Sequence, residues 1–252
     1  MEISGKKAVV IGGASGMGRA SAELLAARGA SVAVLDRPGS GGDKVATQLG
    51  GAFHPVDITD FKAAENAIKA AVEGLGGVHV SVTTAGGGIA KRTVGKEGPH
   101  DLESFRKVLD LNLVATFNIS RLMAAHMSAN EPEDHERGVI INTSSIAAFE
   151  GQIGQVAYTA AKAGIAGMCL TMARDLGTLG VRVLAIAPSL FATGATAAIS
   201  DDFAKTLTKD AAFPRRMGRP EEYAKLVASI VDNQMLNGQC LRLDAGQRFG
   251  PR

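Results

Sequence analysis

The segment Lys7–Ala20, which reads KAVVIGGASGMGRA, determines the fold class of the chain. It opens with a short β-rich apolar run and passes through a glycine-rich turn into a stretch of helical composition. Small residues let the backbone turn sharply and approach a pyrophosphate, while the next helix presents free N–H groups and the positive end of its dipole. Such a turn can also be a plain connection, but its place between a strand and a helix favours phosphate binding. It therefore predicts a dinucleotide-phosphate site made by Gly12, Ser15, Gly16, Met17 and Gly18.

The rest of the chain alternates between expected strands and expected helices. Apolar β-rich runs predict strands at Lys7–Ile11, Ser31–Leu35, Phe53–Val56, Val78–Val82, Val139–Thr143, Val181–Ala187 and Cys240–Leu243. Helical patterns occupy Arg19–Arg28, Asp43–Leu49, Phe61–Glu73, Leu102–Met127, Tyr158–Leu176 and Glu221–Val231. Strands that are apolar throughout should be buried on both faces. The order predicts an α/β Rossmann fold, with a doubly wound parallel sheet and helices on both faces. No linker divides the chain, so residues 1–252 should form one dinucleotide-binding and catalytic domain.

Composition argues against several other classes of protein. Hydrophobic residues make up 46% and aromatic residues only 4%, which predicts a large aliphatic core. The net charge of +2 is too weak to indicate nucleic-acid binding. The longest uncharged run, Val183–Ser200, contains Pro188 and Gly194, so it predicts a strand leading into a loop rather than a membrane span. With no signal-peptide pattern, we expect a cytoplasmic protein without nucleic-acid or membrane partners.

The residues that commonly bind metals are few and dispersed. Cys169 and Cys240 are the only cysteines, and each lies in an apolar run without a CxxC pattern. This predicts two buried free thiols, as in a reducing compartment. The five histidines lack the spacing of metal ligands, so no metal site is expected.

An acidic residue ends the second expected strand. Asp36 lies 18 residues beyond Gly18, where a carboxylate can accept hydrogen bonds from the ribose hydroxyls of NAD and would repel the extra phosphate of NADP. Alternatively, Asp36 only begins a turn with Pro38 and Gly39. The neighbouring Arg37 weakens the exclusion of NADP. The preceding glycine-rich turn favours NAD as the cofactor.

A second acidic position follows the third expected strand. Asp57 and Ile58 are placed to border the adenine of the dinucleotide. Their alternative role is to begin the helix that follows Asp60.

Tyr158 and Lys162 are four residues apart, which places both side chains on one face of a helix. A phenol is a poor base with a pKa of about 10, but a nearby ammonium group and a positive nicotinamide ring favour phenolate. Tyr158 could then take a proton from an alcohol near neutral pH. Ser145, just past a strand, is placed to hold the substrate oxygen. Asn112 is either a helix-packing residue or a link in a proton relay that reaches Lys162 through water.

Together these residues resemble the pattern of the short-chain dehydrogenase/reductase family. The matching positions are Gly12, Gly16, Gly18, Asp36, Ala85, Gly86, Asn112, Ser145, Tyr158 and Lys162, in the family's order and spacing. Within the family, the chain looks most like the type 2 3-hydroxyacyl-CoA dehydrogenases, also described as multifunctional 17β-hydroxysteroid dehydrogenases. The matching stretches are Val108–Asn118, Gly138–Tyr158, Ile186–Thr193, Phe213–Glu222 and Asn237–Gly246.

The resemblance implies further roles. It implies a seven-stranded sheet, a homotetramer assembled partly through the helices that carry Asn112 and Tyr158, and a Lys162 that also binds the nicotinamide ribose. Pro188 and Thr193 would lie near the nicotinamide carboxamide, in a loop that closes over the site. Gln155 would line the substrate cleft. An apolar substrate wall would include Phe191, Phe203, Leu207 and Phe213, for which an ordinary core role is the alternative.

The chain also departs from the family pattern. Thr83 and Thr84 replace two asparagines before Ala85, Ile11 stands where threonine is common, and Ser189 follows Pro188 in place of glycine. These changes bear on cofactor affinity and substrate fit more than on reaction type. The stretch 86–101 is long, polar and glycine-rich, so it predicts a mobile loop or a substrate lip. Its cations, Lys91, Arg92 and Lys96, either meet CoA phosphates or are solvated loop charges.

The expected activity is NAD-dependent, reversible hydride transfer between a secondary alcohol and a ketone. A 3-hydroxyacyl-CoA is the expected substrate, with hydroxysteroids as a further class. One alternative is the reduction of 3-oxoacyl thioesters with NADPH, against which Asp36 argues. Another is a non-catalytic scaffold or RNA-processing subunit, which the weak net charge does not favour.

Overall fold

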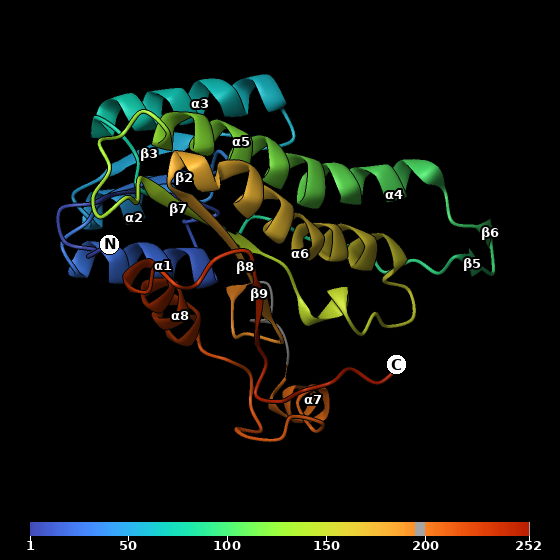
Figure 1. Cartoon of the computed structure of the whole chain (residues 1–252). Coiled ribbons are helices and arrows are strands. Elements are labelled where there is room, and N and C mark those ends of the chain that lie inside the picture. The colour runs from blue at the N-terminus through green and yellow to red at the C-terminus, as the bar shows by residue number, and fades with distance from the viewer. Residues whose placement is uncertain (195–199, 252) are drawn as a thin grey trace.

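A parallel sheet of seven strands forms the centre of the molecule, with helices on both faces (Figure 1). The computed structural model describes residues 1–194 and 200–251. The strands follow the order β3-β2-β1-β4-β7-β8-β9. They span Lys7–Ile11 (β1), Ser31–Asp36 (β2), Ala52–Pro55 (β3), Val80–Thr83 (β4), Gly138–Thr143 (β7), Val181–Pro188 (β8) and Cys240–Leu243 (β9). The predicted doubly wound α/β architecture is therefore confirmed.

The helices lie close to their predicted positions. Their bounds are Gly16–Ala27 (α1), Gly42–Gln48 (α2), Phe61–Leu75 (α3), Leu102–Leu109 (α4), Ala115–Met127 (α5), Val156–Leu176 (α6), Asp201–Leu207 (α7) and Pro220–Asp232 (α8). Short 3-10 turns occupy Ile146–Ala148 and Gly177–Leu179. Helices α1, α2 and α8 cover one face of the sheet, whereas α3, α5 and α6 cover the other.

Strand β1 shows why the central strands are apolar throughout. Its residues alternate between the two faces: Val10 packs toward α1 and α8, while Val9 and Ile11 pack toward α3 and α5. All three side chains are completely buried. The aliphatic core predicted from composition thus forms two layers, one on each face of the sheet.

The strand order creates a crevice at the carboxyl end of β1. This strand pairs with β2 on one side and with β4 on the other, so the chain connections leave in opposite directions. Ligands of open parallel sheets bind at such a reversal point. The glycine-rich turn follows β1 directly and is therefore held at this crevice.

The long helix expected over Leu102–Met127 is interrupted. Residues Asp110–Val114 form a single π-helical turn between α4 and α5, centred on Asn112. A π turn inserts one extra residue into a helix and is frequent at functional sites. By length and composition, Leu102–Met127 and Val156–Leu179 could cross a membrane, but α5 and part of α6 pack against the sheet.

Two elements were not predicted. The stretch expected as an irregular lip contains a short antiparallel pair, Val94–Gly95 (β5) with Gly98–Pro99 (β6), which projects beyond the sheet (Figure 1). Helix α7 follows the part of Val183–Ser200 that lies outside the described residues. Both thiols are free, but Cys240 is only partly buried, unlike the prediction for it.

Candidate active site

A cavity of about 1270 Å³ occupies the crevice at the carboxyl ends of the central strands. Most of the predicted site residues line it: Gly12, Ser15, Gly16, Met17, Asp36, Asp57, Ile58, Ala85, Gly86, Ser145, Tyr158, Lys162, Pro188, Phe191 and Thr193. Their positions in the sequence range over most of the chain. The structure therefore brings the predicted phosphate turn, the acidic residues and the proton-transfer group into one space.

The glycine-rich turn has the tight backbone geometry that a phosphate site requires. Gly12 has a φ of 80° and Gly16 a φ of 52°, backbone angles that residues with a side chain rarely adopt. A Cβ at Gly18 would lie 2.1 Å from the carbonyl oxygen of Gly12, so α1 can approach the turn only without a side chain there. The side chain of Ser15 does not cap α1, which leaves the first N–H groups of that helix available to an anion.

Thr84 supports this turn from the neighbouring strand. Its hydroxyl lies 3.2 Å from the carbonyl oxygens of both Ile11 and Gly12 and donates toward them. The replacement of asparagine by threonine thus keeps a hydrogen bond beneath the cofactor cavity. The sequence marked the position as a departure but did not reveal the contact.

Asp36, the last residue of β2, lines the cavity. One carboxylate oxygen accepts a hydrogen bond from the Ala14 N–H at 3.0 Å, and the other accepts from the Arg37 N–H at 2.7 Å. The carboxylate is therefore fixed beside the turn. Each oxygen retains a further lone pair for a ligand hydroxyl.

Asp57 both lines the cavity and shapes its own turn. It accepts hydrogen bonds from the N–H and the hydroxyl of Thr59, and these bonds lower the pKa of its carboxyl group. The residue that caps α3 is instead Asp60, which accepts from the Ala63 N–H. Asp57 thus lies in the turn that leads to the helix cap, as in its alternative role, and also lines the cavity, while its contact with adenine stays a prediction.

The proton-transfer group gathers where β7 meets α6. Ser145 follows the end of β7, and its hydroxyl accepts a hydrogen bond from the Ala147 N–H. Lys162 is buried, and its Nζ donates to the carbonyl oxygen of Thr143 at 2.9 Å. The same Nζ lies 5.5 Å from the ring centroid of Tyr158. Helical spacing thus brings Tyr158 and Lys162 together, as predicted.

The pKa directions in the free protein differ from the sequence prediction. Burial raises the pKa of the Tyr158 phenol, and a hydrogen bond with Ser145 only partly opposes this. The predicted lowering of this pKa is therefore wrong for the free protein, because the effect of desolvation is larger. Burial also lowers the pKa of Lys162 to about 8. At neutral pH the site therefore holds a neutral phenol beside a charged ammonium group.

Asn112 lies behind Lys162 in the π-helical turn and is fully buried. Its Nδ2 donates to the carbonyl oxygens of Gly87 and Val108, and its Oδ1 accepts from the Gly87 N–H. A Cβ at Gly86 would lie 2.7 Å from Asn112 Oδ1 and 3.3 Å from Lys162 Nζ. The glycine therefore preserves a narrow space between these two polar groups. The water relay stays a prediction.

Several predicted substrate residues lie elsewhere. Gln155 is absent from the lining of the large cavity, although its buried Oε1 has no hydrogen-bond partner within the described residues. Phe213 is 84% exposed and does not line the cavity, nor does Leu207, while the side chain of Phe203 lies outside the described part. Phe191 does line it, and packs edge-on against Tyr223 with ring centroids 6.4 Å apart.

Two residues near the site were not singled out as functional by the sequence. The Thr143 hydroxyl donates to the Thr83 carbonyl oxygen and also forms a 2.7 Å hydrogen bond with the buried Tyr223 hydroxyl. This network fixes Thr143 at the end of β7, and the carbonyl oxygen of Thr143 accepts the hydrogen bond from Lys162 Nζ. Only the position of Thr143 at a strand end, two residues before Ser145, marked it in the sequence.

Comparison with known proteins agrees with this geometry. A family model described as short chain dehydrogenase matches residues 6–204. The chain belongs to the short-chain dehydrogenase family. It is therefore an oxidoreductase that uses a nicotinamide cofactor.

Relatives of this dehydrogenase extend over nearly the whole chain. The 3-hydroxyacyl-CoA dehydrogenase type-2 of Homo sapiens is 47% identical over 99% of this chain and 97% of its own length. A crystal structure of the protein of that name from Mycobacterium avium superimposes with a TM-score of 0.94 at 40% identity, covering 98% of each chain. The 3-oxoacyl-(acyl-carrier-protein) reductase of Vibrio cholerae is 32% identical over 98% of each chain.

The burial of Lys162 in this dehydrogenase leads to a stability prediction. Its pKa is about 8 in the folded protein against a usual value of 10.5, so between these pH values the unfolded chain holds more protons. Stability should therefore rise with pH across this window, and below pH 8 the buried charge costs the folded state stability.

The substitution Lys162→Met should remove this cost at the expense of activity. We expect its Tm to exceed that of the wild type at pH 7 by about 5 °C and the difference to shrink toward pH 10. Calorimetry at both pH values measures it. A Tm difference that is constant with pH would show that Lys162 does not titrate in this range.

Proposed function

We propose that this dehydrogenase oxidises the 3-hydroxyl group of 3-hydroxyacyl-CoA esters reversibly, with NAD as hydride acceptor. The observation that carries the proposal is the joining, in one cavity, of Ser145, Tyr158 and Lys162 with the phosphate turn and Asp36. The names of the human and mycobacterial relatives support the acyl-CoA class. Hydroxysteroids form a second substrate class to be tested.

The protein residues divide the proton chemistry among them. Ser145 holds the substrate oxygen, and the Tyr158 phenolate accepts the proton of the alcohol. The charged Lys162, 5.5 Å from the ring centroid, and the positive charge that an oxidised nicotinamide would supply would together favour phenolate and oppose the effect of burial. A nicotinamide cofactor held by the glycine-rich turn and Asp36 would supply the acceptor for the hydride from C3 of the substrate. Asn112 and Lys162 together would return the proton to solvent.

Burial explains why Tyr158 needs this assistance. In the free protein its pKa is raised, so the phenol is a proton donor rather than an acceptor at neutral pH. That state suits reduction of a ketone. Oxidation should therefore be favoured as pH rises, because it requires phenolate.

The choice of NAD over NADP depends on Asp36. Its carboxylate is fixed by two backbone N–H groups beside the turn, where it can accept from ribose hydroxyls and repel a phosphate. The adjacent Arg37 also lines the cavity and would favour NADP. The fixed position of the carboxylate supports NAD.

The substitution Asp36→Asn tests this choice with little change in shape. The amide oxygen keeps one of the two backbone N–H contacts, while the other is lost together with the charge. We expect kcat/KM for NADP to rise about tenfold, equivalent to about 1.4 kcal/mol. Initial rates with both cofactors measure it. A wild-type preference for NADPH would contradict the cofactor proposal and favour the reductase alternative.

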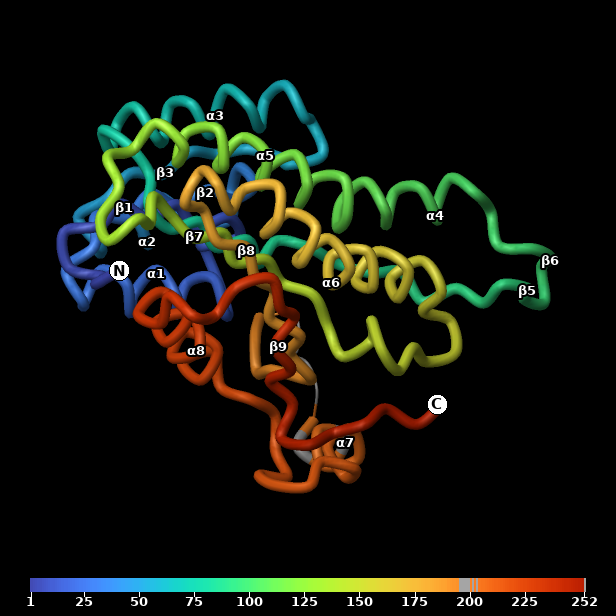
Figure 2. Tube along the Cα trace, viewed as in Figure 1, coloured from blue at the N-terminus to red at the C-terminus, as the bar shows by residue number. Residues whose placement is uncertain are grey.

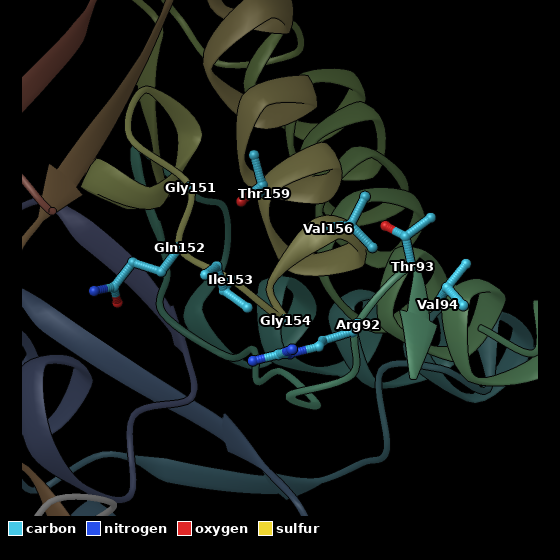
Figure 3. A pocket seen from close by; sticks show the side chains of 9 residues that line it. All are labelled: Arg92, Thr93, Val94, Gly151, Gln152, Ile153, Gly154, Val156 and Thr159. Atoms are coloured by element: carbon cyan, nitrogen blue, oxygen red, sulfur yellow. The ribbon is translucent and has the colours of Figure 1, made fainter. Parts of the chain in front are cut away.

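A smaller pocket beside the cavity supports a contact with the CoA moiety. It has a volume of about 410 Å³ and lies between the β5 arm and the start of α6, and shares no lining residue with the large cavity. Figure 3 shows the Arg92 side chain passing beneath Gly154, with Ile153 and Val156 as apolar walls. Within the described residues, Arg92 has no ion-pair partner, whereas Lys91 pairs with Asp101. Arg92 is therefore the better candidate for a phosphate.

The substitution Arg92→Ala should affect only substrates that carry CoA phosphates. We expect KM for a 3-hydroxyacyl-CoA to rise about fivefold, as for an exposed charge pair of about 1 kcal/mol. KM for the matching N-acetylcysteamine thioester, which lacks phosphates, should not change. An equal rise in KM for both thioesters would show that Arg92 does not bind a phosphate of CoA. Lys91→Ala is the matched control, because its charge is already engaged.

The substrate class is tested by a panel of thioesters and hydroxysteroids with NAD and NADP, followed at 340 nm. We expect the highest kcat/KM for a 3-hydroxyacyl-CoA with NAD. Absence of turnover on every compound would contradict the proposal and favour a scaffold or RNA-processing role. Retained NAD binding in that case would separate a lost activity from a misfolded protein.

The assembly state proposed from the family is a homotetramer. Helices α5 and α6 carry apolar side chains that remain exposed in the single chain, including Phe117 and Leu170. Contact between copies through these helices would cover them. Light scattering after size exclusion measures the mass directly.

A further inference from the structure

The segment between the two oxygen-bearing residues of the site has little regular structure of its own. Ser145 and Tyr158 are joined by residues 146–157, in which only a 3-10 turn at Ile146–Ala148 precedes the start of α6 at Val156. Two hydrogen bonds join the end of β7 directly to α6, from the Ser144 hydroxyl to the Lys162 carbonyl oxygen and from Lys162 Nζ to the Thr143 carbonyl oxygen. The contacts that hold residues 149–155 from outside are a second influence on the positions of the serine and tyrosine hydroxyls.

Arg242, at the end of β9, holds this segment through a two-pronged contact. Its Nη1 and Nη2 donate to the two carboxylate oxygens of Glu150 at 2.8 and 2.9 Å. Its guanidinium also lies 5.1 Å from the ring centroid of Phe149. Arg242 thus binds two consecutive residues just beyond the 3-10 turn that follows Ser145.

The Arg242 side chain is itself held in place. Its Nε donates to Asp244 at 2.6 Å and its Nη2 to the Gln247 carbonyl oxygen at 3.1 Å. Arg248 donates to the same Asp244 carboxylate and lies 3.6 Å from Glu150. The side chains of Arg242 and Glu150 are 22% and 24% exposed, so solvent screens the pair less than a surface contact.

The rest of the C-terminal segment continues along residues 149–155. The Ile153 N–H donates to the Pro251 carbonyl oxygen at 3.1 Å, and Gln152 reaches the Gly250 carbonyl oxygen at 3.5 Å. Figure 2 shows this last part of the chain, in red, passing between the segment after β7 and α7. The C-terminal segment is thus the outer support of the segment that follows Ser145.

Residues 244–247, which follow Arg242, also contact a second part of the chain. The Gln247 side chain is buried and donates to the Leu207 carbonyl oxygen at the end of α7. The N–H groups of Ala212 and Phe213 donate to the Ala245 carbonyl oxygen. Residues 244–247 therefore connect the segment after Ser145 with residues 207–213.

We propose that Arg242 is a positioning residue. It influences the geometry of Ser145 and Tyr158 by fixing Glu150 against residues 242–248. The inference rests on the proposed function for its readout. Its physical basis is the two-pronged, charge-assisted contact on a segment whose other hydrogen bonds to distant described residues, such as those of Ile153 and Gly154, are single. Among the described residues, loss of Arg242 leaves Glu150 only the longer contact with Arg248, and loss of Glu150 leaves Arg242 ion-paired with Asp244 alone. In both cases the two-pronged contact that holds the segment is gone, so the segment is expected to shift.

The test compares Arg242→Ala, Glu150→Ala and the double variant by steady-state kinetics well below their Tm. We expect each single variant to lower kcat for the 3-hydroxyacyl-CoA at least tenfold and to raise its KM. The Kd for NAD should stay within twofold of wild type, because the phosphate turn and Asp36 lie elsewhere. The double variant should be no worse than either single variant, as expected of residues that act as a pair.

Three further variants complete the design. Arg242→Lys should recover only part of kcat, because an ammonium group cannot form the two parallel hydrogen bonds. Glu150→Gln removes the charge with little change in shape and serves if Arg242→Ala does not fold. Arg28→Ala, which breaks the exposed pair with Asp232, is the matched control and should keep wild-type kinetics.

Three results would overturn the inference. The first is a folded Arg242→Ala variant whose kcat and KM stay within twofold of wild type. The second is a double variant whose fold-loss in kcat equals the product of the two single fold-losses. The third is a loss of NAD affinity as large as the loss of kcat, which would indicate general destabilisation. If instead the wild type does not turn over the thioester, the proposed function fails, and this outcome is distinct from all three.

Discussion

Replacing Tyr158 with phenylalanine should reduce kcat by about 10³-fold while leaving NAD binding intact. The phenol lines the cavity, forms a hydrogen bond with Ser145, and its ring centroid lies 5.5 Å from the ammonium of Lys162. Phenylalanine keeps the ring beneath Lys162 Nζ and removes only the hydroxyl. The loss should therefore fall on proton transfer rather than on folding.

The second tyrosine provides the matched control. Tyr223 is completely buried and shares a hydrogen bond with Thr143, so Tyr223→Phe should lower stability by about 1 kcal/mol and retain most of the turnover. Rates at 340 nm and the Kd for NAD are measured for both variants. Unchanged turnover in Tyr158→Phe would remove Tyr158 from the mechanism.

Introducing a methyl group at Gly18 should raise the Kd for NAD about a hundredfold, through distortion of the phosphate turn. The new Cβ would lie 2.1 Å from the Gly12 carbonyl oxygen and 2.5 Å from the Thr84 hydroxyl, so either the turn or α1 must shift. Forced overpacking of about 2 kcal/mol should also lower the Tm by about 5 °C.

Gly74→Ala is the control for Gly18→Ala. Gly74 lies in α3, and no atom comes within 4 Å of the place that an added methyl group would occupy. Alanine there should leave NAD affinity unchanged and slightly raise stability. Calorimetric titration with NAD compares the two variants. Wild-type affinity in Gly18→Ala would show that the close approach of α1 to the turn is not needed for cofactor binding.

The sequence predicted the architecture because the physical signals were local and repeated. Apolar runs on β1, β4, β7 and β8 reflect burial on both faces, and a glycine between a strand and a helix reflects a close backbone approach. The bounds of β1 and β9 agree with the predicted ranges. Helix α1 was predicted to start at Arg19 but starts at Gly16. Glycine is tolerated in a first turn, whose N–H groups have no partner within the helix and remain available to a ligand.

The features that the sequence did not predict depend on contacts between distant residues. The π-helical turn at Asn112 follows from its hydrogen bonds to Gly87 and Val108, one of them to a residue far away in the chain. The raised pKa of Tyr158 follows from burial, which spacing on a helix does not report. The position of Gln155 outside the large cavity depends on how the segment after Ser145 is held.

Hydride transfer from substrate to cofactor can be followed with a 3-hydroxyacyl-CoA that carries deuterium at C3. The dehydrogenase is incubated with this compound and NAD, and the reduced cofactor is examined by mass spectrometry. We expect the deuterium to appear in NADH in one-to-one ratio with the ketone formed. Ketone formation with the deuterium lost to water, or no reaction with a folded protein that binds NAD, would contradict hydride transfer to NAD as the reaction of this site.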